Sequence, residues 1–489
     1  MTSVEQYAED LVWVCSTCVQ EAFLQGLMTQ RSVGECSCCG LNDCLGMSLE
    51  ELADRVETAF ESHYQQTSAE PDSFQQAMLR DKESNYNWER VGEPVLDVLA
   101  ELLECGEDVA TEVQTILDER HGSYDPRDGY DGESPFSCES CYEQKAVSTS
   151  AWELSWQRLE HSLQHESRLF NQEVLELFHS VFSGLDNASS QSQGLAIVTA
   201  GPGRDITALY RAREFQSDAT LKDALQRPVE ALGPPPGRNA RSNRMNSSGI
   251  SVFYGACEAK SALAEVRPVV GSNVVVAKFS ILRPVQLLDL PALEKLTCNG
   301  SLFDPQYAAE LERHGFLRSL SKRLVMPVMP NDQDHAYLIT QAVADYLASL
   351  QSPTVDGIIF PSVQDGVGLN VVLFHKASLV APLDFPPGTT FSAELWDYDH
   401  DTGKSHPSFW LQVDKPSESV EPVPAEFQLP GAAVRDAYDT KKRQPALKLE
   451  LEEIKVHTIK AVEVKDVSQK VFLGFGTYPG KKTLHDSKF

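Results

Sequence analysis

The sequence predicts an α+β protein with more than one domain, and three observations lead to that prediction. Residues 94–117, PVLDVLAELLECGEDVATEVQTIL, alternate apolar and acidic residues at helical spacing. From residue 195 onward the pattern changes to short apolar runs typical of strands, such as LAIVTA and NVVVAKFSIL. Nine of the eleven cysteines lie before residue 142, so the N-terminal part has a chemistry of its own. With 489 residues, the chain is long enough for two to four domains.

These patterns divide the chain into four segments. We expect an acidic, mainly helical domain over residues 1–145 and a connecting helix with a linker over 146–195. An α+β domain over 196–387 follows, in which the helices CEAKSALAEV and AYLITQAVADYLASL separate the strands. Residues 388–489 contain hairpin-like pieces and are expected to form an appended β-rich extension.

The connecting segment is predicted to be one long helix. Trp152, Trp156, Leu159 and Leu163 recur there at helical spacing, which indicates a packed face. Such a stripe of aromatic residues is more typical of a core than of a cofactor site.

Charge is distributed unevenly along the chain. The net charge is −29, and residues 1–150 hold 31 acidic against 8 basic residues. So acidic a surface repels a phosphate backbone, which disfavours general nucleic-acid binding by this region. We expect it to contact a basic partner or a neighbouring subunit instead. No apolar run reaches 18 residues and the N-terminus is acidic, so we expect a cytoplasmic protein without a membrane segment.

Two CxxC pairs predict a structural zinc site in the N-terminal domain. They supply the four thiolates that a closed tetrahedral site needs, namely Cys15, Cys18, Cys36 and Cys39. Cys38 and Cys44 are spare thiols that could substitute as ligands. The third pair, Cys138 and Cys141, could replace one of the first two or hold a second ion. For any single cysteine, a buried free thiol is the alternative.

One stretch concentrates polar groups within an apolar pattern: RSNRMNSSGISVFYGACEAKSALAEVRP, residues 241–268. Arg244 precedes a turn that Asn246 and Gly249 permit, and Tyr254 lies in the strand that follows. Glu265 lies in the next apolar helix. An isolated glutamate there is ordinarily a solvated helix residue, but LYRAR upstream and IIFPSVQDGVGLNVVLF downstream favour a site.

Taken together and in this order, these motifs resemble the RES-domain family. The cysteine pairs and HESRLFN resemble the HEPN-type N-terminal region fused to some RES domains, although the Arg–His pattern of ribonuclease HEPN domains is missing. The resemblance implies a fold similar to ADP-ribosyltransferases and an activity that degrades NAD+, by phosphorolysis or hydrolysis. It also implies a toxin or defence effector with a protein partner or antitoxin.

The resemblance also implies the site residues. The family's residues fall on Arg211, Arg244, Tyr254, Glu265 and Ser362, although NRMN lacks the double glycine and the tryptophan of the family's GGRWN. Glu265, Arg211 and Tyr254 are the expected catalytic residues. Residues expected to bind substrate are Arg244, Asn246, Ser362 and Arg213.

Elementary chemistry agrees with these roles. Breaking the nicotinamide–ribose bond builds positive charge on the sugar, which a carboxylate such as Glu265 stabilises. Guanidinium groups such as Arg211 and Arg244 suit a pyrophosphate or an attacking inorganic phosphate. Two alternatives remain at this point: a transferase that attaches ADP-ribose to a macromolecule, and a non-enzymatic, zinc-stabilised interaction protein.

Overall fold

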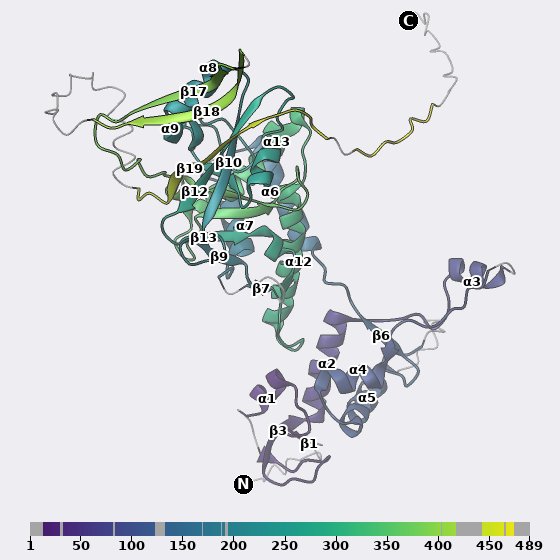
Figure 1. Cartoon of the computed structure of the whole chain (residues 1–489). Helices are drawn as coiled ribbons and strands as arrows, with labels where there is room; N and C mark the ends of the chain where they lie inside the picture. Colours follow the sequence, from purple (N-terminus) through teal and green to yellow (C-terminus); the bar gives the residue numbers. More distant parts are fainter. Residues whose placement is uncertain are drawn as a thin grey trace, which may run out of the picture.

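The structure is a computed structural model. It describes residues 13–29, 33–81, 84–122, 133–168, 170–186, 188–190, 194–401, 403–416, 443–463 and 466–473. Figure 1 shows an N-terminal part, coloured purple and blue, and a larger part coloured teal to yellow. Each part has its own buried apolar cluster, so the chain has separate cores. The exact boundaries near residues 145, 195 and 387 stay predictions.

The N-terminal part is mainly helical. Its helices are α1 (Ala22–Met28), α2 (Leu49–His63), α3 (Ser73–Arg80), α4 (Val95–Leu103) and α5 (Glu107–His121). The apolar faces of α2, α4 and α5 bury Leu52, Leu99 and Val113 in one cluster. Two small antiparallel sheets complete this part: β1 (Trp13–Cys15), β3 (Cys44–Ser48) and β2 (Val33–Gly34) in one, and β4 (Tyr64–Gln66), β6 (Cys141–Gln144) and β5 (Glu93–Pro94) in the other.

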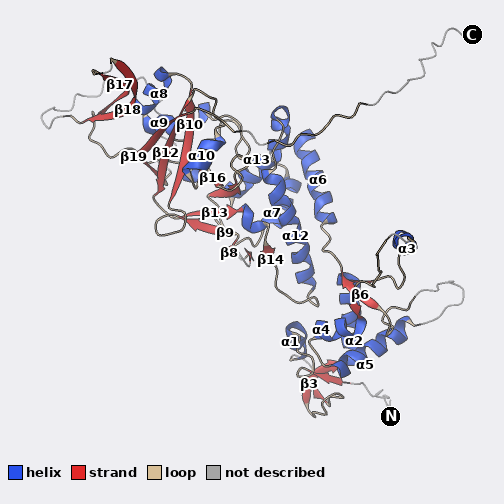
Figure 2. Ribbon diagram, turned by 45° about the vertical axis from the view of Figure 1, so that its right-hand side comes forward, coloured by secondary structure: helices blue, strands red, loops and turns tan. Residues whose placement is uncertain are grey.

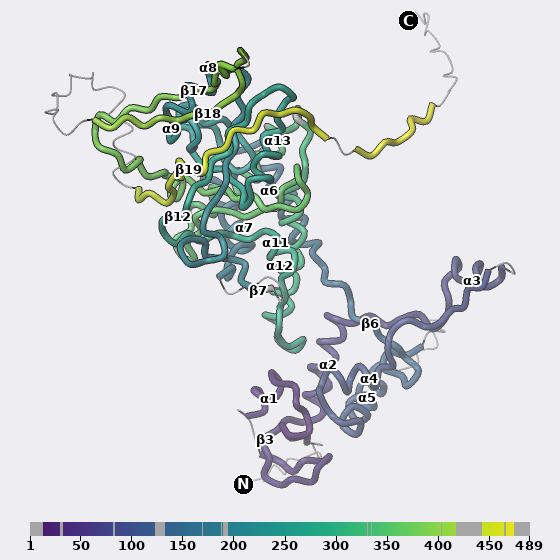
Figure 3. Tube along the Cα trace, viewed as in Figure 1, coloured from purple at the N-terminus to yellow at the C-terminus, as the bar shows by residue number. Residues whose placement is uncertain are grey.

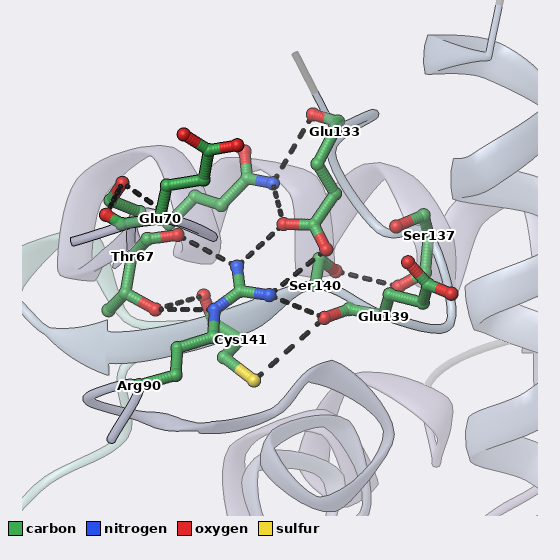
Figure 4. A network of polar contacts seen from close by, with 10 residues as sticks. Thr67, Glu70, Arg90, Glu133, Ser137, Glu139, Ser140 and Cys141 are labelled. Carbon is green, nitrogen blue, oxygen red and sulfur yellow. Dashed lines mark hydrogen bonds and ion pairs between the residues drawn. The ribbon is translucent and has the colours of Figure 1, made fainter. Parts of the chain in front are cut away.

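A polar network fastens the second of these sheets (Figure 4). Arg90 forms a two-fold pair with the Glu133 carboxylate, at 2.6 and 3.0 Å. The same guanidinium donates to the carbonyls of Thr67 and Glu139, both at 2.7 Å. Both side chains of the ion pair are largely shielded from water, so the pair is less screened than a typical surface pair.

The larger part is built on an eight-stranded sheet with the order β19-β12-β10-β11-β16-β15-β13-β9 (Figure 2). Its pairs are antiparallel except β13 with β15, which is parallel. The strands are β9 (Ile197–Ala200), β10 (Ala208–Phe215), β11 (Phe253–Ala256), β12 (Asn273–Ile281), β13 (Val285–Asp289), β15 (Gly357–Pro361), β16 (Leu369–Leu373) and β19 (Leu447–Thr458). A separate three-stranded sheet is formed by β14 (Leu296–Thr297), β7 (Ser189–Ser190) and β8 (Gly194–Leu195), in the order β14-β7-β8.

Both faces of the main sheet are covered. Because neighbouring residues of a strand point to opposite faces, Ile358 and Val372 pack in one cluster, and Ile359 and Val371 pack in another. Helices on the first face are α6 (Ser150–His165), α7 (Gln172–Phe182), α11 (Leu290–Leu293), α12 (Pro305–Val325) and α13 (Gln333–Ser349). On the second face lie α8 (Asp218–Gln226), α9 (Pro228–Leu232) and the hairpin of β17 (Thr390–Asp399) and β18 (Lys404–Asp414). Helix α10 (Ala259–Glu265) packs against β10, β11 and β12.

Two organisational predictions need correction. The connecting segment is not one long helix: α6 ends at His165 and α7 begins after Asn171, whose side chain caps it by accepting from the Val174 amide at 3.2 Å. The residues after 388 are not wholly an appendage either, since β19 pairs with β12 along its length as an edge strand of the main sheet. The predicted packed face is present, because Trp156, Leu159 and Leu163 are buried.

Helix α12 connects the two parts of the protein. Leu302 and Phe303, just before its first turn, pack in the apolar cluster of the N-terminal part, although they belong to the larger part by sequence. Figures 1 and 3 both show this end of α12 reaching toward α2. The other end packs Leu320 and Leu324 against the main sheet's helical layer. Among the helices described, none is long and apolar enough to cross a membrane.

Candidate functional site

The residues of the candidate site come from strands that are neighbours in the main sheet. Arg211 lies on β10, Tyr254 on β11 and Asn370 on β16, and Ser362 directly follows β15. These strands are adjacent in the order β10-β11-β16-β15, and neighbouring strands lie about 4.8 Å apart. Residues that are far apart in the sequence therefore lie close together in the sheet. Glu265 reaches the same place from the last residue of α10.

A cavity of about 500 Å³ lies over this part of the sheet. Arg211, Arg244, Tyr254 and Glu265 all line it, so the structure brings together four of the predicted residues. A smaller cavity of about 180 Å³ shares Arg244 and Glu265 with it. The combined size lies within the ordinary range for small-molecule sites. A larger cavity, about 960 Å³, lies beside α7 and α13 but contains none of the predicted residues.

The Glu265 carboxylate is held through one of its two oxygens. Ser362 donates its hydroxyl to Oε1 at 2.6 Å, and Asn370 donates its Nδ2 amide to the same oxygen at 2.8 Å. Both donors are almost completely buried. Within the described part of the chain, Oε2 has no partner. A carboxylate at a helix C-terminus is unfavourable for the helix dipole, so these donors compensate for a position that stability alone does not favour.

The loop after β15 fixes Ser362. Asp365 accepts from the amides of Val367 at 2.9 Å and Gly368 at 2.7 Å, and from the Ser261 hydroxyl on α10. Although burial opposes it, the Ser261 and backbone donors lower the pKa of Asp365, so the carboxylate stays charged. A Cβ at Gly368 would lie 1.9 Å from Ser261 Oγ, so the close approach of this loop to α10 requires glycine.

The two predicted arginines that line the cavity are oriented by backbone carbonyls. Arg211 donates to the Tyr254 carbonyl at 3.0 Å, and its buried Nε has no partner among the described residues. Burial, together with the positive charge of the neighbouring Arg213, lowers the pKa of Arg211 to about 9. Arg244 donates to the carbonyls of Leu324 at 2.8 Å and Met326 at 2.7 Å, which lie at the end of α12.

Tyr254 and Asn246 act together on the loop between them. The Tyr254 hydroxyl donates to Asn246 Oδ1 at 3.1 Å and accepts from the Met245 amide at 3.0 Å. Asn246 is buried and donates to three backbone carbonyls of its own loop, so it shapes the loop and does not line the cavity. Burial raises the pKa of Tyr254, so its hydroxyl stays protonated.

Arg213 is not brought to the cavity. Its guanidinium donates to the Gly233 carbonyl at the end of α9, at 3.1 Å. Burial lowers the pKa of Arg213, which is consistent with a position inside the protein and away from the cavity. The structure therefore places three of the four predicted substrate-binding residues outside the cavity lining, namely Asn246, Arg213 and Ser362. The Ser362 hydroxyl donates to Glu265 instead.

Two residues of this site were not predicted from the sequence. Asn370 holds Glu265, and the signal available was a buried polar residue inside the apolar run LNVVLF. Tyr337, on α13, lines both cavities. The centre of its ring lies 5.1 Å from Cζ of Arg244. A cation over an aromatic face is held without consuming its hydrogen-bond donors, so Arg244 keeps donors for a ligand.

The four predicted zinc ligands also come together. The sulfurs of Cys15, Cys18, Cys36 and Cys39 lie within 4.8 Å of one another. The Cys15–Cys18, Cys15–Cys39 and Cys18–Cys36 sulfur separations are 3.7, 3.6 and 3.8 Å. A tetrahedron with zinc–sulfur distances of about 2.3 Å has edges of about 3.8 Å, so the set fits a zinc ion.

Charge supports the same assignment. Burial and the sulfurs of its neighbours Cys39, Cys15 and Cys36 raise the pKa of Cys18. In contrast, donors at Thr17 outweigh burial and lower the pKa of Cys15 to about 6. Four close thiolates repel one another, and a divalent cation supplies the charge that lets all four ionise.

The other cysteines do not join this cluster. Cys44 donates its thiol to the Gly34 carbonyl, and Cys141 lies on β6, where its sulfur is 3.9 Å from the Glu139 carbonyl (Figure 4). Cys138 is exposed, and Cys38 packs beside the apolar cluster. Among the described residues, the four-sulfur set contains none of these, which favours the first two CxxC pairs over the alternatives.

Comparison with known proteins gives one match. Residues 208–398 match the family model of the RES domain. The match begins at the first residue of β10 and contains every residue that lines the two cavities, but it covers less than half of the chain. No curated protein and no solved structure matches the chain. The likeness to ADP-ribosyltransferases and to HEPN-type regions therefore stays a prediction.

Proposed function

We propose that the RES segment binds NAD+ in the two joined cavities and cleaves the bond between nicotinamide and ribose. The observation that carries this proposal is the Glu265 carboxylate, which lines both cavities and is fixed by Ser362 and Asn370 through Oε1. Its other oxygen, Oε2, has no partner among the residues that the structure describes. Such a carboxylate suits the ribose hydroxyls of a sugar that becomes cationic as its glycosidic bond breaks.

The geometry supports a role for each residue. Glu265 stabilises the developing oxocarbenium ion, since the negative charge gains most when the sugar is cationic. Arg211 and Arg244 are pre-oriented by backbone carbonyls and retain unused N–H donors for phosphate oxygens. Tyr254 sets the loop that carries Arg244, through its contacts with Asn246 and Met245.

The N-terminal part has a separate proposed role. We propose that it binds one structural zinc ion and a basic protein partner, such as an antitoxin, and thereby controls the cavity as part of a toxin or defence effector. The acidity of the N-terminal part favours a partner of positive charge. The packing of Leu302 and Phe303 in its apolar cluster supports a connection between this part and the larger part. The zinc would hold the first two CxxC pairs together and supply folding free energy.

The test is incubation of the purified full chain with NAD+, with and without inorganic phosphate, followed by the mass of the products. Release of nicotinamide supports the proposal. ADP-ribose 1″-phosphate then indicates phosphorolysis, free ADP-ribose indicates hydrolysis, and a mass increase on a protein or nucleic acid indicates transfer. NAD+ that stays intact both with and without phosphate contradicts the proposal.

A further inference from the structure

A third arginine lines the site, and neither the motifs nor the roles above account for it. Arg267 follows Glu265 by two residues and lines both cavities. Its side chain is exposed, and its guanidinium has no hydrogen-bond or ion-pair partner among the residues that the structure describes. It differs in this from Arg211 and Arg244, whose donors are partly engaged by backbone carbonyls.

The backbone at Arg267 is in a costly conformation. Its φ is +47°, in the left-handed region that side chains with a Cβ rarely adopt. The close approach of Cβ to the following carbonyl oxygen makes this conformation unfavourable for a residue other than glycine. The Arg267 amide donates to the Ala264 carbonyl at 3.1 Å, so this turn ends α10 and brings the arginine to the cavity. Glycine suits such a turn better, so an arginine here indicates that its guanidinium has a use.

The charge of the cavity indicates what that use is. Among the described residues that line the two cavities, three are arginines and Glu265 is the one acid. The site therefore carries a formal charge of about +2 inside a protein of net charge −29. A diphosphate group carries two negative charges, so it balances the site, whereas an uncharged nucleoside leaves three arginines facing one carboxylate.

We propose that Arg267 binds phosphate oxygens of the ligand and makes the cavity selective for a nucleotide with a diphosphate group. This inference rests on the proposed function only in placing the ligand in this cavity. Arg267 is the ligand's contact at the cavity opening, where an exposed guanidinium can reach an incoming anion before the inner arginines do. Because it is exposed, its contribution is screened by salt.

Binding of ADP-ribose and of adenosine to the full chain tests this proposal without requiring turnover. We expect Arg267→Ala to raise the Kd for ADP-ribose about tenfold, since a hydrogen bond to a charged group is worth about 1.5 kcal/mol. Arg267→Lys keeps the charge and should recover part of this loss. The Kd for adenosine should not change in either variant, and the salt dependence of ADP-ribose binding should be weaker in Arg267→Ala than in the unmodified chain.

Two controls separate binding from general effects. Arg241 is exposed, lies in the loop that carries Arg244 and lines neither cavity, so Arg241→Ala should leave the Kd for ADP-ribose unchanged. Arg267→Gly relieves the backbone conformation while removing the guanidinium, so it should weaken ADP-ribose binding as Arg267→Ala does, without lowering the melting temperature.

Each outcome bears on the proposal. Equal ADP-ribose binding by Arg267→Ala and the unmodified chain overturns it, as does an equal loss of adenosine binding or no ADP-ribose binding by the unmodified chain. A chain that binds ADP-ribose through Arg267 but leaves NAD+ intact keeps this inference and contradicts the proposed cleavage. If the unmodified chain and Arg267→Ala cleave NAD+ equally well and bind ADP-ribose equally well, the proposed cleavage is supported and this inference is contradicted.

Discussion

Asn370 and Glu265 lie 105 residues apart in sequence, and the Asn370 amide donates to Glu265 Oε1 at 2.8 Å. Asn370 occupies β16 between Ala256 on β11 and Phe360 on β15, so its position is set by the register of three strands. The sheet therefore positions the carboxylate more directly than the short helix that carries it. This relationship makes the acid a preorganised group, which is what an electrostatic catalyst requires.

The two donors to Glu265 should therefore act as a unit. We expect Asn370→Ala and Ser362→Ala each to lower kcat for NAD+ cleavage roughly tenfold to a hundredfold, because each removes a hydrogen bond to a charged group. Since both donors position the same oxygen, the double variant should lose less than the product of the two single losses. Steady-state kinetics of the four proteins measures this coupling.

A buried serine elsewhere in the larger part provides the control. Ser378 is fully buried and donates to the His375 carbonyl, away from Glu265. Ser378→Ala should lower stability slightly and leave kcat unchanged. Multiplicative losses in the double variant would indicate that Ser362 and Asn370 act independently of one another.

Arg244 should be sensitive to the shape of its side chain as well as to its charge. Its guanidinium spans the carbonyls of Leu324 and Met326, and a lysine ammonium cannot match both while facing the cavity. We expect Arg244→Ala to raise KM for NAD+ about tenfold or more, from loss of phosphate binding, and Arg244→Lys to recover little. Arg267→Lys should recover more, and equal recovery at both positions would contradict this distinction.

The zinc site allows a matched pair of cysteine variants. Cys36 is one of the four clustered sulfurs, whereas Cys38 is outside the cluster and only two residues away. We expect Cys36→Ser to lose zinc and to unfold the N-terminal part, because a structural zinc contributes about 10 kcal/mol or more in small modules. Cys38→Ser should keep one zinc ion per chain. Elemental analysis of the purified proteins decides, and absence of zinc from the unmodified chain would remove the assignment.

Phe303 should hold the two parts of the protein together. It is 8% exposed and packs in the N-terminal cluster, so Phe303→Ala should cost about 3 kcal/mol and expose the segment around residue 147 to proteolysis. Phe74 is 72% exposed on α3, and Phe74→Ala should change stability by about 0.5 kcal/mol or less. Denaturation and limited proteolysis measure both variants, and equal behaviour would show that the Phe303 contact is dispensable.

Much of the fold follows from local patterns. Strands β9, β11 and β12 and helices α10 and α13 lie where the apolar patterns place them, and Arg211, Arg244 and Glu265 line one cavity. The helix break at residues 166–171 was missed, because the apolar spacing on both sides continues through it. The place of β19 was missed because pairing with a strand more than 160 residues away leaves no local signal.

Side-chain partners from distant segments explain the remaining differences in the site. Arg211 and Arg213 lie two residues apart on β10, so strand periodicity alone gives them the same face. What separates them is the end of α9, where Gly233 accepts from Arg213. Asn246 was expected at the ligand, but its amide is engaged by its own loop.

The most direct test of the account compares nicotinamide release by the unmodified chain and by Glu265→Gln at saturating NAD+, together with ADP-ribose binding by both. Glutamine keeps the size and hydrogen-bonding reach of the side chain but removes its charge. We expect release to fall about a hundredfold to a thousandfold while ADP-ribose binding and the melting temperature stay close to those of the unmodified chain. Release at nearly the same rate in both proteins would show that Glu265 is an ordinary solvated helix residue and would contradict the central claim.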